Sequence, residues 1–169
     1  HVHMLSLKDT GSLPAIMINR AKELDCPVIG VTDHGYMIAI FESIEIAQEN
    51  NMKIVAGCEC YLEHPITKKK MHICLYANGK EGYKALCKVV TKSNLRVEKV
   101  GTLTYPIVSM ELLEEYAKLG VLKATSACIA GPICSIFEKN DILKQQIDKL
   151  VAKAGKNPNK KELEKDKEK

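Results

Sequence analysis

Imidazole, carboxylate and thiol side chains stand next to short apolar runs along much of this sequence. His1 and His3 form an H-x-H pair, and both imidazoles point to one side if the segment is extended, because alternate residues of a strand share a face. The remaining groups stand where an apolar run ends or begins, at Asp33-His34, Glu59, His72 and Cys128. Histidine, carboxylate and thiolate ligands together suit zinc, manganese or iron.

Each of these residues also has an interpretation without a metal. An H-x-H pair can occur by chance, and a polar pair after a strand can cap the next helix instead of binding a ligand. Glu59 could be a solvated carboxylate and His72 a half-buried imidazole at a sheet edge. Cys128 could be an inert thiol or a nucleophile. Cys58-x-Cys60 has the wrong spacing for a structural zinc site, which usually uses C-x2-C pairs, and His64 is expected in a surface loop.

The elements that must position these residues alternate between amphipathic helices and short apolar strands. Helices are predicted over residues 14–24, 38–49, 82–92 and 110–119, and strands over residues 28–31, 54–56, 73–76 and 121–124. This alternation favours a parallel sheet or barrel, whereas residues 63–70 and 97–108 are expected to be irregular. In a parallel barrel the C-terminal ends of the strands converge on one mouth, where active sites lie.

Four of the five histidines would therefore meet at one face of the predicted barrel, together with two carboxylates and a thiol. Six or more ligands are too many for a single tetrahedral ion, so the sequence predicts a centre of two or three metals. Such centres activate a water molecule and stabilise the attacking and leaving oxygens of a phosphoester. The residues by themselves thus favour phosphoester hydrolysis.

The composition is that of an ordinary globular chain. Its 169 residues, 46% of them hydrophobic and 27% charged, allow one domain or one domain plus a tail. Neither a signal peptide nor an apolar run of about 20 residues, which a membrane-spanning helix needs, is present. Seven cysteines, an odd number spread along the chain, suit a reducing cytoplasm better than a disulfide framework.

The net charge of +4 is concentrated near the C-terminus. Residues 153–169 hold seven Lys against four acidic residues, which leaves 18 basic and 17 acidic side chains in residues 1–152. A nearly neutral body gives no global attraction for nucleic acid, so DNA binding must depend on a local site. We expect one domain over residues 1–152, and a charged tail or the start of a helical insertion over residues 153–169. Because the sequence opens with a histidine, we expect a piece of a longer product.

The ordered motifs resemble the polymerase and histidinol phosphatase (PHP) domain, in the version at the N-terminus of the bacterial and phage DNA polymerase III alpha subunit. The resemblance covers about residues 1–138 and lies in six segments. They are His1-Val2-His3, Val31-Thr32-Asp33-His34-Gly35, Gly57-Cys58-Glu59, His72-Ile73-Cys74-Leu75, residues 81–87 and Ser126-Ala127-Cys128-Ile129-Ala130-Gly131. The last two segments are those that resemble the polymerase branch of the family.

The resemblance implies an α/β fold, an incomplete and distorted (β/α)7 TIM-like barrel with two or three divalent metals at its mouth. These would be zinc, manganese or iron. The implied role of Asp33 is to hold His34 in one tautomer, as metal-bound histidines generally require. The implied metal ligands are His1, His3, Asp9, His34, Glu59, His72 and Cys128.

Two features depart from the family pattern. The first acidic ligand of the family usually stands seven residues after the second histidine, whereas Asp9 stands six residues after His3. The family also completes its site with an Asp-x-His motif near the end of the barrel, and these 169 residues contain no such motif. The implied site is therefore incomplete.

The implied function is that of the PHP domain of a replicative DNA polymerase, a cytoplasmic nucleotidyltransferase whose PHP site has metal-dependent phosphoesterase or 3′–5′ exonuclease activity. The resemblance implies as partners the primer-template DNA, the remainder of the polymerase chain and replisome subunits such as the sliding clamp, with no membrane. Magnesium would act in a polymerase palm outside these residues. Two alternatives are a non-catalytic structural PHP module and a stand-alone PHP phosphatase for a small phosphomonoester.

Overall fold

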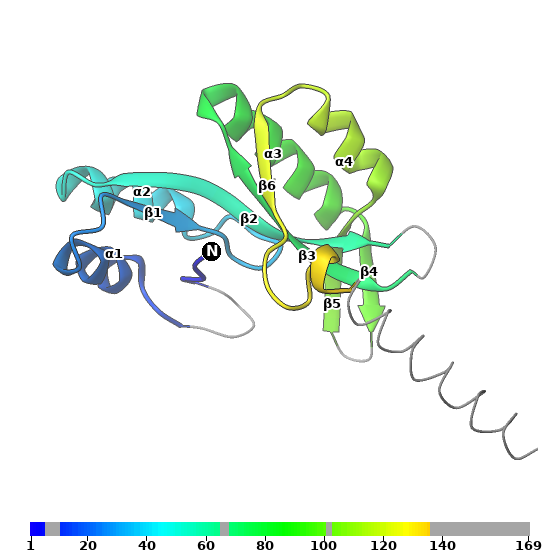
Figure 1. Ribbon diagram of the computed structural model, residues 1–169, viewed down its shortest axis with the longest axis horizontal. Coiled ribbons are helices and arrows are strands. Elements are labelled where there is room, and N and C mark those ends of the chain that lie inside the picture. The colour runs from blue at the N-terminus through cyan, green and yellow to red at the C-terminus, as the bar shows by residue number, and fades with distance from the viewer. Residues whose placement is uncertain (6–10, 65–67, 101–102, 136–169) are drawn as a thin grey trace, which may run out of the picture. The chain divides into compact units, whose positions relative to one another are not determined.

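The computed structural model of the chain describes residues 1–5, 11–64, 68–100 and 103–135 (Figure 1). Residues 1–132 form one compact unit, which contains the helices and strands named below. The helices are α1 (Pro14–Glu23), α2 (Ile40–Glu49), α3 (Gly79–Asn94) and α4 (Met110–Ala117). The strands are β1 (Val28–Val31), β2 (Lys53–Glu63), β3 (Lys70–Ala77), β4 (Val97–Val100), β5 (Leu103–Val108) and β6 (Leu122–Thr125).

Strand β2 organises a six-stranded mixed sheet, which has the order β4-β5-β2-β3-β6 and in which β1 also pairs with β2. β3 runs antiparallel to residues 57–63 of β2. On the opposite edge, β1 pairs in parallel with residues 53–56, and β5 pairs in parallel with Tyr61 and Leu62. The eleven residues of β2 therefore connect the parallel β1–β2 pair with the parallel β2–β5 pair. Figure 1 shows this strand running from α1 and α2 toward α3 and α4.

The helices cover the face of the sheet to which the even-numbered residues of β2 point. Ile54 and Ala56 pack with the core formed by β1, α1 and α2, whereas Cys58, Cys60 and Leu62 pack with the core beneath α3. Because side chains alternate along a strand, the odd-numbered residues of β2 point to the other face. That face carries the candidate site.

Local sequence explains where several elements begin. Pro14 stands in the first turn of α1, where a backbone N–H would have no helical partner. Ser109 caps α4, because its hydroxyl accepts a hydrogen bond from the Leu112 N–H at 3.3 Å. The buried residues of α3 recur every three or four positions and give the helix one buried face: Gly82, Ala85, Leu86, Val89, Val90 and Ser93.

The predicted α/β class is confirmed, and the sheet with helices on one face is consistent with an incomplete, distorted barrel. The four predicted helices and four predicted strands are present. The parallel arrangement is wrong for three pairs, since β2–β3, β3–β6 and β4–β5 are antiparallel. The prediction that residues 97–108 are irregular is also wrong, because β4 and β5 form a hairpin that a local apolar pattern does not indicate.

Other predictions concern residues that the structure does not describe. The domain boundary predicted at residues 152 and 153, and the charged tail after it, lie outside the described residues, as does the predicted ligand Asp9. Among the helices of the described part, none combines the length with the apolar character that crossing a bilayer requires.

Two strand glycines provide a matched test of how tightly the sheet is packed. A Cβ on Gly57 would lie 2.8 Å from both Leu75 O and Thr32 Cγ2, whereas a Cβ on Gly30 would meet only Tyr76 Cε1 at 3.9 Å. Gly57→Ala should therefore lower the free energy of unfolding by about 1–3 kcal/mol. Gly30→Ala should leave it unchanged or raise it by up to about 1 kcal/mol. Urea denaturation of both variants measures the difference, and equal stabilities would contradict the close approach at Gly57.

Candidate metal centre

Glu59 is the centre of the site. Its side chain is completely buried, at 0% exposure, on the odd-numbered face of β2. The prediction that Glu59 stands just after the end of its strand is wrong, because β2 continues to Glu63. The strand continues because Cys58, Cys60 and Leu62 face the apolar core beneath α3. Glu59 therefore lies in the middle of the sheet.

His34 lies beside Glu59 because the β1–β2 register resumes after β1 has ended. Val31 pairs with Ala56, and an isolated parallel bridge pairs His34 with Glu59, which keeps the same offset of 25 residues. The Glu59 N–H donates to the Asp33 carbonyl at 3.0 Å, and the Gly35 N–H donates to the Glu59 carbonyl at 2.8 Å. This pairing sets the two side chains next to each other, and His34 Nδ1 contacts Glu59 Oε2.

His72 reaches Glu59 from the opposite edge of β2. It pairs with Tyr61, two residues beyond Glu59, so all three side chains share one face. His72 Nδ1 lies 2.9 Å from Glu59 Oε1. The exposed Cys128 is next to this imidazole, with Sγ 3.3 Å from Nδ1. The loop that carries Cys128 is attached to β3, because the backbone N–H of His72 donates to the Ala130 carbonyl at 2.9 Å.

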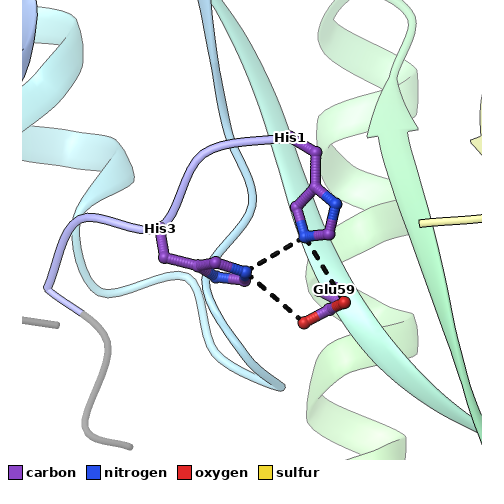
Figure 2. Close-up of side chains that lie close together, drawn as sticks. All are labelled: His1, His3 and Glu59. Carbon is purple, nitrogen blue, oxygen red and sulfur yellow. Dashed lines mark hydrogen bonds and ion pairs between the residues drawn. The ribbon is translucent and has the colours of Figure 1, made fainter. Parts of the chain in front are cut away.

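The N-terminal H-x-H segment supplies two further imidazoles. Figure 2 shows His1 and His3 pointing toward the Glu59 carboxylate from the start of the chain. Nε2 of His1 lies 3.3 Å from Glu59 Oε1, and Nε2 of His3 lies 3.6 Å from Oε2. The two Nε2 atoms are 3.0 Å apart. One buried carboxylate therefore has four imidazoles around it.

The imidazoles determine the protonation state of Glu59. Burial acts to raise the pKa of the carboxyl, because it desolvates the charged form. Hydrogen bonds from His34 and His72, together with the charges of those imidazoles, act in the opposite direction and outweigh burial, so the pKa falls from 4.5 to about 2. Glu59 is thus an anion at neutral pH.

Cys74 on β3 pairs with Glu59, but the pKa of its thiol shifts in the opposite direction. Burial, followed by the negative charge of Glu59, raises the pKa of the Cys74 thiol from 9.0 to about 11. The thiol therefore stays protonated at neutral pH. Among the described residues, Cys74 belongs to neither group of side chains that could hold a metal ion.

The donor set fits divalent metal ions. Two groups of side chains could each hold a metal ion, because the potential ligand atoms within each group lie within 4.8 Å of one another. One group is formed by His1, His3 and Glu59, and the other by His34, Glu59 and His72. Two ligand atoms on one tetrahedral zinc ion lie about 3.3 Å apart, since each bond is about 2.0–2.1 Å long. The separations of 3.0, 3.3 and 3.6 Å in the first group are close to this value.

The role assigned to Asp33 requires a correction. The implied role of its carboxylate is to hold the His34 imidazole, whereas Oδ1 of Asp33 accepts a hydrogen bond from the Met4 N–H at 2.7 Å. The physical reason is the alternation of the extended backbone, because His34 is in register with Glu59 and the side chain before it points to the opposite side. Asp33 thus contacts the N-terminal segment.

The remaining residues fall as follows. Cys58 and Cys60 are buried in the apolar core, away from the face that carries Glu59, and His64 lies in the turn after β2. Tyr61 is a site residue that the sequence did not predict. Its buried ring stacks on His34 with centroids 6.1 Å apart and meets His72 edge-on at 5.2 Å. Its position two residues after Glu59 would have indicated it, had the strand been predicted at its full length.

Comparison with known proteins assigns the chain to a family. The model of the PHP domain matches residues 1–163. The chain belongs to the PHP domain family. The DNA polymerase III subunit alpha of Helicobacter pylori is 30% identical to this PHP chain over 142 residues, which is 79% of the chain and 11% of that protein. The corresponding subunit of Borreliella burgdorferi is 31% identical over 160 residues, 85% of the chain and 13% of that protein.

Solved structures show weaker similarity to the PHP chain. A proposed metal-dependent phosphoesterase from Bifidobacterium adolescentis matches with a TM-score of 0.45 and 16% identity, over 56% of this chain and 32% of that chain. An amidohydrolase from Chromobacterium violaceum matches with a TM-score of 0.44 and 19% identity, over 55% and 32%. The family assignment therefore depends on the sequence match.

The lowered pKa of Glu59 predicts an acid-sensitive contribution to stability. Because the pKa is about 2 in the folded chain against 4.5 ordinarily, the carboxylate stabilises the fold above pH 4.5. This contribution is lost as the pH falls from 4.5 to about 2. Glu59→Gln should therefore flatten the dependence of the free energy of unfolding on pH over this range, as measured by urea denaturation of the metal-free chain.

Glu63→Gln is the matched control, since Glu63 lies on the same strand and the same face but pairs with Lys68 in the following turn. It should keep the wild-type slope between the two pH values. A wild-type slope in Glu59→Gln would contradict the assignment of the acid-sensitive contribution to Glu59.

Proposed function

We propose that the chain is the N-terminal PHP domain of a DNA polymerase III alpha subunit and that its site hydrolyses phosphodiesters in a metal-dependent 3′–5′ exonuclease reaction. The observation that carries this proposal is the buried Glu59 carboxylate with four imidazoles around it. The chain spans only 11% to 13% of the two alpha subunits to which it was compared. Nucleotidyl transfer, with its magnesium ions, would therefore belong to other parts of the parent protein.

Two groups of side chains would hold the metal ions, which we propose to be two or three ions of zinc, manganese or iron. His1, His3 and Glu59 form one group, and His34, Glu59 and His72 form the other. Cys128, beside His72, and Asp9 are further candidate ligands. When bound, divalent ions supply an activated water molecule and positive charge that stabilises the attacking and leaving oxygens of a phosphodiester.

Both oxygens of Glu59 lie between the two histidine groups. Oε1 faces His1 and His72, and Oε2 faces His3 and His34, so each oxygen has one neighbour from each group. The low pKa keeps the carboxylate charged at neutral pH, which makes both oxygens available as ligands. Glu59 is therefore suited to bridge the two groups.

The same face of the sheet offers groups that could bind substrate phosphates. Strand β6 pairs with β3, so Thr125 stands opposite Cys74 and Lys123 stands opposite Tyr76. Both β6 side chains are exposed, and the Thr125 hydroxyl lies 3.5 Å from the Tyr76 hydroxyl. An ammonium and a hydroxyl next to a metal site are suited to hold the backbone of a DNA strand.

This function places the domain with the remainder of the polymerase chain and with primer-template DNA in the cytoplasm. Replisome subunits such as the sliding clamp would be partners of the full-length protein. The nearly neutral charge of residues 1–152 agrees with such a division, because a local site and the rest of the parent protein would then supply DNA affinity.

Metal analysis combined with a nuclease assay tests the proposal. The purified chain should bind two or more equivalents of zinc or manganese, and the parent polymerase should shorten a 5′-labelled single-stranded oligonucleotide from its 3′ end. Glu59→Gln should lower both metal content and hydrolysis, the latter by about 100-fold or more, because it removes a ligand shared by both groups. Glu63→Gln should leave both unchanged.

Two outcomes would contradict the proposal in different ways. A folded wild-type chain without metal under saturating zinc and manganese would contradict the metal centre itself. Two bound ions without hydrolysis, in the chain and in the parent polymerase, would contradict the exonuclease reaction and favour a structural PHP module. Hydrolysis of a small phosphomonoester but not of the oligonucleotide would favour a PHP phosphatase.

A further inference from the structure

The segment that carries His1 and His3 is attached to the sheet mainly by side chains. The Val2 N–H donates to Thr32 Oγ1 at 3.0 Å, and the Thr32 N–H donates to the Val2 carbonyl at 2.9 Å. Two residues further on, the Met4 N–H donates to Asp33 Oδ1 at 2.7 Å. A carboxylate thus takes the place that a backbone carbonyl would have in a regular strand pair.

The Asp33–Met4 hydrogen bond has the properties of a strong anchor. Asp33 is 2% exposed and Met4 is 0% exposed, so water does not compete for the bond. Its acceptor is charged and its length is short, and charge-assisted hydrogen bonds are about twice as strong as neutral ones. The Met4 side chain is buried as well, in the core with α1 and α2.

The two histidine groups differ in how they are held. His34 and His72 stand in register with residues of the long strand β2, so backbone pairing fixes them. His1 and His3 lie on a segment outside any strand, three residues and one residue before the anchor at Met4, respectively. Sites of this kind require ligand positions within about 0.5 Å of the productive geometry. The N-terminal pair therefore depends on its anchor.

We propose that Asp33 is a positioning residue, whose carboxylate fixes the Met4 backbone and thereby sets the His1 and His3 Nε2 atoms against Glu59. This inference rests on the proposed function only in taking those two imidazoles as metal ligands. It assigns a separable task to Asp33, because loss of its carboxylate disturbs the His1–His3–Glu59 group and spares the His34–Glu59–His72 group. Thr32 assists by holding Val2.

A zinc titration of three versions of the chain, wild type, Asp33→Asn and Asp33→Ala, tests this assignment. Imidazole NMR signals report each histidine separately, and hydrogen exchange at the Met4 amide reports the anchor. Exchange at Met4 should be fastest in Asp33→Ala, about tenfold or more above wild type, and intermediate in Asp33→Asn, which keeps a neutral acceptor. The zinc affinity sensed by His1 and His3 should weaken in the same order, while that sensed by His34 and His72 should change less than twofold.

Ser43→Ala is the matched control, since the Ser43 hydroxyl contacts the Met4 sulfur at 3.3 Å but not its backbone. It should leave both the Met4 exchange rate and the zinc response of His1 and His3 at wild-type values. If Asp33→Ala does not fold, the comparison of wild type with Asp33→Asn decides by the same two measurements.

Unchanged zinc affinity at His1 and His3 in a variant with faster Met4 exchange would overturn the positioning role. Equal weakening at all four histidines would also overturn it, because that result describes a general loss of structure. If the wild-type chain bound no zinc, the proposed function would fail, whereas equal Met4 exchange in wild type and Asp33→Ala would refute the anchor independently of any metal.

Discussion

The structure depends on the burial of one carboxylate in the middle of a sheet. Removing a carboxylate from water costs several kcal/mol, and a fold tolerates this only where hydrogen bonds or opposite charges compensate. Glu59 is buried because β2 has β3 on one edge and the His34 bridge on the other, and because α3 covers the apolar face behind it. The compensation comes from imidazoles that arrive from three separate parts of the chain. The burial of Glu59 therefore requires the histidines to converge on it.

The topology of the sheet meets this requirement. β1 and β5 pair with successive parts of one edge of the long strand β2. Between them the chain has left β1, and His34 pairs with Glu59. The helices pack on the even-numbered face of β2, so the odd-numbered face is left to the site. Two residues before Glu59, Gly57 permits Leu75 O and Thr32 Cγ2 to approach the strand closely. The fold therefore separates an apolar face that provides stability from a polar face that provides chemistry.

Much of this arrangement could be predicted from the sequence, because periodic apolar residues indicate helices and strands locally. The helix at Pro14–Glu23 and the strand at Val28–Val31 are examples, and the grouping of His1, His3, His34, Glu59 and His72 on one face followed from motif order. The full length of β2 could not be predicted, because a strand buried on both faces is expected to be almost continuously apolar, so the charged Glu59 looks like the end of the strand. The antiparallel pairs and the Asp33–Met4 hydrogen bond depend on contacts between residues distant in sequence, which a local pattern does not contain.

Anomalous diffraction from crystals of the chain grown with zinc tests whether the side chains around Glu59 hold metal ions. We expect at least two zinc peaks, each within about 2.0–2.2 Å of a Glu59 oxygen, with His1 and His3 binding one ion and His34 and His72 the other. Zinc bound elsewhere, for example by Cys58 and Cys60, with the Glu59 carboxylate still hydrogen-bonded only to imidazoles, would contradict this expectation. In that case the histidine cluster would serve to compensate a buried charge and would have no role in metal chemistry.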